Sequence, residues 1–150
     1  MVTECLTRGG LETRLLTQAR ELERKGREVF FATSSREVPS AFRDFAAHII
    51  TGLPIDGAAS AYQCARAAEL LAETIRTRDI SIVHGHPFAS LVPAAIAAAL
   101  TERPLTITAH GPESFLGGNN FDAALYDAVL PYAASIRLVC AAGRSTTTTA

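Results

Sequence analysis

The feature that most constrains the fold of this chain is a regular alternation between short apolar runs and longer amphipathic stretches. The short runs are rich in β-branched and aromatic residues and are bounded by turn-forming residues, which is typical of strands. We predict strands over residues 2–6, 28–33, 47–50, 80–86, 104–110 and 135–140. Because these runs are apolar almost throughout, we expect them in a sheet with both faces covered.

The longer stretches place apolar residues at helical spacing on one stripe. In the first of them Leu15 and Ala19 share a face, and Gly26 follows a basic last turn, which is a common end of a helix. Ser90 stands where it can cap a later helix. We predict helices over residues 11–25, 41–45, 59–77, 90–100 and 121–132.

Strands that alternate with helices of this length indicate a parallel sheet with helices on both faces. We therefore expect an α/β fold, a Rossmann-like doubly wound sheet, as a single domain over residues 1–150. The Thr-rich tail at 145–150 has low helix propensity, and we expect it to fray.

The composition excludes several classes of protein. The chain has 48% apolar and 19% charged residues and a net charge of −1, with no basic block, so we expect no nucleic-acid partner. Its three cysteines, Cys5, Cys64 and Cys140, show neither a C-x-x-C pair nor metal-ligand spacing, which indicates reduced thiols. We find no apolar leader, and the longest apolar run, 91–100, is too short for a membrane span, so we expect a cytoplasmic protein.

Ligands of such sheets bind outside the carboxyl ends of the strands, and glycines and histidines gather in those loops. Gly9 and Gly10 precede a helix N-terminus, whose free N–H groups favour a phosphate. The other interpretation is a tight turn, with Glu12 capping the first amides. Without a G-x-G-x-x-G pattern, the motif alone favours the turn.

Three of the four histidines lie in the same set of loops. His84 and His86 share a face if the strand continues through Gly85, but no acid stands at metal-ligand spacing from them. We interpret His84 as a hydrogen-bonded histidine and His86 as a residue that lines the cleft. His110 ends a strand before Gly111, and it is either a satisfied strand-end histidine or a donor that faces a ligand.

Taken in order, these segments resemble the N-terminal, acceptor-side domain of GT-B fold glycosyltransferases, specifically the family-4-like retaining enzymes. The resemblance rests on "GGLETRLLTQARELERKGREVFFAT", on "DISIVHGHPFASLVPAAIAAAL" and on "RPLTITAHGPE". It covers nearly the whole chain, which it identifies as one half of a GT-B architecture. The family's second domain holds the nucleotide and carries an acidic E-x7-E motif, and we find no such segment before Ala150.

The resemblance implies a site. Gly9, Gly10 and Gly111 would contact the donor diphosphate and sugar, and His110 would be the catalytic residue near the reacting centre. His86 and Glu113 would line the acceptor side of the cleft. The family transfers sugars without a metal or other cofactor, the nucleotide-sugar being the donor substrate.

The resemblance thus predicts transfer of a sugar from a nucleotide-sugar to a small-molecule or glycan acceptor, with a C-terminal domain supplied in cis or in trans. We expect the 150-residue chain to be inactive alone. The alternative is a non-catalytic binding or interaction module that kept the fold, a homo-oligomer included. A dehydrogenase fragment is disfavoured, because Thr33-Ser34-Ser35 stands where such folds carry an acid. Nothing in the sequence indicates contact with a membrane surface.

Overall fold

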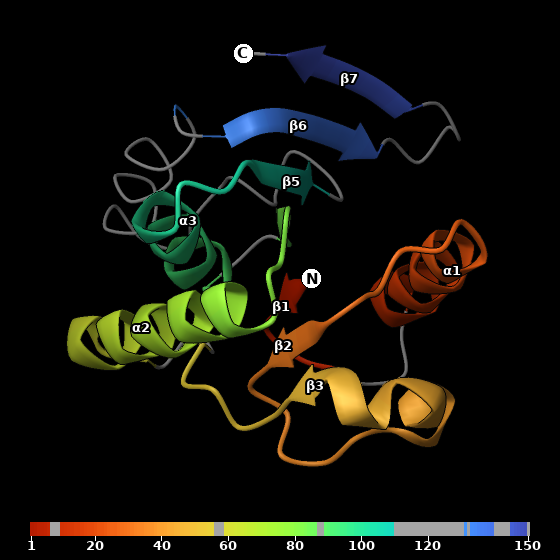
Figure 1. Cartoon of the computed structure of the whole chain (residues 1–150), viewed down its shortest axis with the longest axis horizontal. Helices are drawn as coiled ribbons and strands as arrows, with labels where there is room; N and C mark the ends of the chain where they lie inside the picture. Colours follow the sequence, from red (N-terminus) through yellow and green to blue (C-terminus); the bar gives the residue numbers. More distant parts are fainter. Residues whose placement is uncertain are drawn as a thin grey trace.

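The computed structural model describes residues 1–6, 10–55, 59–86, 89–109, 131, 133–139 and 145–149. Its centre is a seven-stranded sheet with the order β3-β2-β1-β4-β5-β6-β7 (Figure 1). The strands are β1 (Val2–Thr3), β2 (Phe31–Thr33), β3 (Ile49–Ile50), β4 (Val83–Gly85), β5 (Leu105–Ala109), β6 (Ala133–Val139) and β7 (Ser145–Thr149).

The first six strands are parallel, and the order 3-2-1-4-5-6 is that of a doubly wound α/β sheet. The register pairs Val2 of β1 with Ala32 of β2 on one side and with Gly85 of β4 on the other. Parallel strands have all their carboxyl ends at one edge of the sheet, so the loops that follow them meet there. The Rossmann-like fold that the alternation predicted is confirmed.

Helices cover both faces of this sheet, as the pattern predicted (Figure 1). The described helices are α1 (Gly10–Arg24), the 3-10 helix η1 (Ser40–His48), α2 (Ala61–Thr77) and α3 (Leu91–Leu100). Neighbouring side chains of a strand point to opposite faces. In β2, Phe31 packs with residues of α1 and η1, whereas Ala32 packs with residues of α2 and α3.

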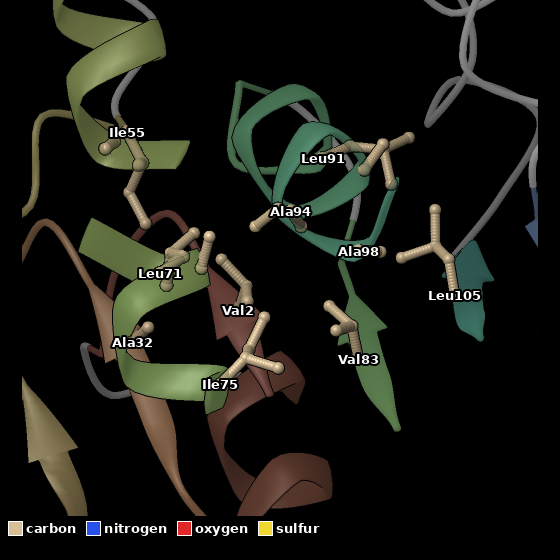
Figure 2. Close-up of a cluster of buried hydrophobic side chains, with 14 of the residues drawn as sticks. Val2, Ala32, Ile55, Leu71, Ile75, Val83, Leu91, Ala94, Ala98 and Leu105 are labelled. Atoms are coloured by element: carbon tan, nitrogen blue, oxygen red, sulfur yellow. The ribbon is translucent and has the colours of Figure 1, made fainter. Parts of the chain in front are cut away.

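The larger core lies between the sheet and the pair α2 and α3 (Figure 2). Leu71 and Ile75 of α2 meet Val2 and Ala32, while Leu91 of α3 lies on the side of β4 and β5. The capping box of Ser60 and Gln63 begins α2, since each side chain accepts a hydrogen bond from the other residue's backbone N–H. The packing of α2 and α3 against the sheet fixes β1 and β4, and the expected site lies at the carboxyl ends of these strands.

Three local features differ from the expectations. The segment expected as a helix over 41–45 is a longer 3-10 helix. Ser90 stands at the N-cap of α3 but makes no capping bond, because its backbone is helical (φ −68°, ψ −19°) rather than extended, and its hydroxyl donates to the carbonyl of His86 at 3.0 Å. The tail expected to fray instead forms β7, antiparallel to β6. Threonine disfavours helices but is a good strand former, which explains the difference. The helix expected over 121–132 lies outside the described residues, apart from residue 131.

Candidate functional site

The carboxyl edge of the sheet brings together segments from four parts of the sequence. Residues 4–6 follow β1, and Thr33 is the last residue of β2, with Ser34 and Ser35 in the loop after it. Gly52 lies beyond β3, and His86 directly follows β4. The register places β1 between β2 and β4, so these segments are neighbours. This is the edge at which open α/β sheets bind ligands.

Gly10 is the first residue of α1 and is exposed. Its φ is outside the left-handed region, and an added Cβ would meet no heavy atom of the described residues within 4 Å. Neither the backbone conformation nor the described packing therefore requires a glycine at this position. Its partner in the motif, Gly9, lies outside the described residues.

The first turn of α1 also carries Glu12, which is buried at 7% exposure. A carboxylate is favourable near a helix N-terminus, where the dipole is positive. The Cys5 thiol donates to Oε1 of Glu12 over 4.0 Å, which joins the segment after β1 to the first turn of α1. This contact thus links the two described ends of the connection between β1 and α1, on either side of residues 7–9.

The two histidines of β4 and its end lie side by side. Their ring centroids are 4.4 Å apart at an interplanar angle of 39°, so the prediction that they share a face is confirmed. His84 Nε2 and Thr108 Oγ1 are 2.7 Å apart, which confirms the interpretation of His84 as a hydrogen-bonded histidine. His86 is 1% exposed, so it does not line an open cleft in this structure, and its role at the acceptor stays a prediction.

Thr108 is a residue of this edge that the sequence reasoning missed. It is 3% exposed on β5 and follows Thr106, while Leu105 and Ile107 occupy the alternate positions and are buried in the core with α2 and α3. The period-two pattern of "LTIT" was the available signal, since it separates a polar face of the strand from an apolar one.

The other expected site residues, His110, Gly111 and Glu113, lie outside the described residues. The last described residue before them is Ala109, at which β5 ends. Since β5 is parallel to β4, this end belongs to the same edge as His86.

The described residues contain no group of three or more His, Cys, Asp or Glu side chains placed to hold a metal ion, and none of their helices is long and apolar enough to span a membrane. A small apolar cavity lies elsewhere, between α2 and the amino-terminal ends of β1, β2 and β4, with Phe30, Ile75 and Ile80 in its wall. Its lining offers hydrocarbon rather than the polar groups that a sugar or phosphate requires.

The thiol of Cys64 allows a test of the local environment of α2. Burial raises the pKa of the Cys64 thiol above its ordinary value of 9.0. A raised pKa means less thiolate at any given pH, so alkylation of folded Cys64 should reach half of its maximal rate at a higher pH than in the unfolded chain. Iodoacetamide labelling across a pH series, read by peptide mass spectrometry with and without urea, measures both midpoints. A folded midpoint at or below the unfolded one would contradict the prediction.

Comparison with known proteins finds a family match for most of the chain. The model of a family described as Glycosyltransferase Family 4 matches residues 8–146. No curated protein sequence matches the chain.

Proposed function

The chain belongs to glycosyltransferase family 4, and on that premise we propose that it forms the acceptor-side half of a retaining enzyme that uses a nucleotide-sugar donor. In this proposal the carboxyl edge of the sheet faces the reacting centre. The nucleotide and most of the diphosphate are held by a second domain, in cis or in trans. No metal ion takes part in the transfer.

The main support for this proposal is that nothing in the described fold requires a glycine at position 10. A glycine that is exposed, has no left-handed φ and has open space where a Cβ would stand is not explained by the fold of the described residues. It stands at a helix N-terminus, where backbone N–H groups and the helix dipole favour an anion. A side chain at this position would keep a diphosphate from approaching the backbone closely.

The proposed chemistry follows from charge. Departure of a nucleoside diphosphate from the sugar places negative charge on the phosphate oxygens, while the sugar becomes oxocarbenium-like. Amides aimed at the leaving diphosphate stabilise that charge as it develops. His110 is proposed to act at the donor sugar, with Gly111 leaving room beside it, and His86 and Glu113 are proposed to contact the acceptor.

A transfer assay tests the proposed division between two domains. We expect the 150-residue chain alone to give no turnover with UDP-sugars or GDP-sugars and a panel of glycan acceptors. Addition of a donor-binding domain, fused or separate, should restore transfer. Robust turnover by the chain alone would contradict the need for a second domain.

Substitution of Gly10 separates a role in ligand binding from a role in folding. Gly10→Ala should leave the free energy of unfolding unchanged or raise it by up to about 1 kcal/mol, because alanine is the better helix former. The same change should weaken binding of inorganic pyrophosphate. Chemical denaturation gives the stability, and titration followed by amide chemical shifts gives the affinity.

Gly26 supplies the matched control. It also has open space around an added Cβ, but its φ of +72° is in the left-handed region after α1. Gly26→Ala should therefore cost about 1 kcal/mol of stability and leave pyrophosphate affinity unchanged. If Gly10→Ala behaves in the same way as Gly26→Ala, Gly10 serves the fold alone.

A further inference from the structure

The loop at the end of β2 carries three consecutive hydroxyl side chains, Thr33, Ser34 and Ser35, which we call the hydroxyl hub. In dinucleotide-binding folds a carboxylate in this region accepts the ribose hydroxyls. Here the hydroxyls are engaged with the backbone of the neighbouring loops. The hub lies at the carboxyl edge between the segments that follow β1 and β3.

The hub holds the point at which β1 ends. The Glu4 carbonyl oxygen accepts from Thr33 Oγ1 at 3.3 Å and from the Ser34 N–H at 3.0 Å, and it also accepts from Ser34 Oγ. Three donors therefore converge on one carbonyl oxygen, immediately after the last paired residue of β1. Such convergence fixes the direction in which the chain leaves the strand.

The hub also holds Leu6, the last described residue before the glycines. Ser35 Oγ accepts from the Leu6 N–H at 2.8 Å, and Leu6 itself is 2% exposed. The Ser35 N–H in turn donates to Thr33 Oγ1 at 3.2 Å, so the Thr33 hydroxyl holds the backbone of Ser35. A buried backbone N–H that loses its acceptor destabilises the folded state, so the hydrogen bond to the Ser35 hydroxyl restricts the position of Leu6.

Backbone carbonyls of the hub reach the loop on its other side. The Gly52 N–H donates to the Ser35 carbonyl at 2.9 Å, and the Leu53 N–H donates to the Thr33 carbonyl at 3.0 Å. Gly52 has a φ of +70°, a conformation that a glycine adopts without strain. The hub thus ties the segments after β1, β2 and β3 into one unit.

We propose that Ser35, supported by Thr33 and Ser34, is a positioning residue that sets where Gly10 presents its amide to the donor diphosphate. This rests on the proposed function. The hub acts through Glu4 and Leu6, which lead from β1 toward α1, and it touches no substrate.

The test compares Ser35→Ala with Ser35→Thr, which keeps the hydroxyl. Hydrogen exchange measured by NMR reports on the Leu6 and Gly10 amides, and titration with inorganic pyrophosphate reports on ligand affinity. Ser35→Ala should accelerate exchange at both amides and weaken pyrophosphate binding by up to about tenfold, because the most that positioning can contribute is the free energy of the intramolecular hydrogen bond that is lost. Ser35→Thr should restore both readouts. Ser34→Ala, which removes one donor to Glu4, should act in the same direction if Ser35→Ala does not fold.

Thr101→Ala is the matched control, since Thr101 is half-buried and its Oγ1 donates to the Ala97 carbonyl at 2.7 Å, near the end of α3. It should affect neither readout. The proposal is overturned if Ser35→Ala matches Thr101→Ala, or if Ser35→Thr folds but restores nothing. Failure of the native chain to bind pyrophosphate at Gly10 would overturn the ligand role of Gly10, whereas exchange at Leu6 and Gly10 would still decide whether the hub positions that segment.

Discussion

Phe31→Ala is expected to lower the free energy of unfolding by about 3–5 kcal/mol, a large part of the stability of an ordinary domain. Phe31 of β2 is fully buried between α1 and η1. Its ring meets those of Phe42 and Phe45 edge to face, with centroids 5.3 and 5.4 Å apart. Alanine would leave a cavity and remove both ring contacts, which add to the loss of buried area. Urea denaturation followed by circular dichroism measures the change.

The neighbouring residue Phe30 is the control for this prediction. It is half-buried and lies against His48 and the guanidinium of Arg78 rather than inside the aromatic cluster. Phe30→Ala should therefore cost clearly less than Phe31→Ala. Equal losses for the two variants would mean that the cluster of Phe31, Phe42 and Phe45 is not the main support of this face of the sheet.

The order and type of most elements could be predicted from the sequence, because strand and helix differ in hydrophobic period. Leu15 and Ala19 recur at helical spacing and are both buried in α1. Strand lengths were less predictable, since β1 and β4 each pair over fewer residues than their apolar runs contain. Helix propensity alone is also misleading at residues 145–149, because threonines that disfavour a helix form a strand by pairing with β6.

The site was predictable in outline for a different reason. Parallel strands place the loops that follow them at one edge of the sheet, so position in the chain is enough to assign Gly10, His84 and His86 to that edge. The partners of these residues were not predictable. Thr108 meets His84 through the register of β4 with β5, and Ser35 meets Leu6 through that of β1 with β2. Such registers depend on packing between distant segments, which one sequence does not reveal.

The second large effect is expected at His110. In an enzyme completed by a donor-binding domain, His110→Ala should lower kcat by roughly 10²-fold or more, while the melting temperature changes little. The reason is its place in the chain. In the sequence it directly follows Ala109, the last residue of β5, and the proposal puts its ring at the donor sugar. A group that stabilises charge only as the glycosidic bond breaks contributes to turnover and not to folding.

His48→Ala provides the comparison for His110→Ala. His48 lies at the end of η1, where its Nε2 is 3.4 Å from a carboxylate oxygen of Glu28, and its side chain is partly exposed. This variant should retain kcat, with at most a small loss of stability, since exposed ion pairs contribute little. Steady-state transfer rates and thermal unfolding of both variants show whether His110 acts in catalysis or in folding. Parallel losses of rate and stability in His110→Ala would identify a structural histidine, whereas a loss of rate alone is what a residue at the reacting centre produces.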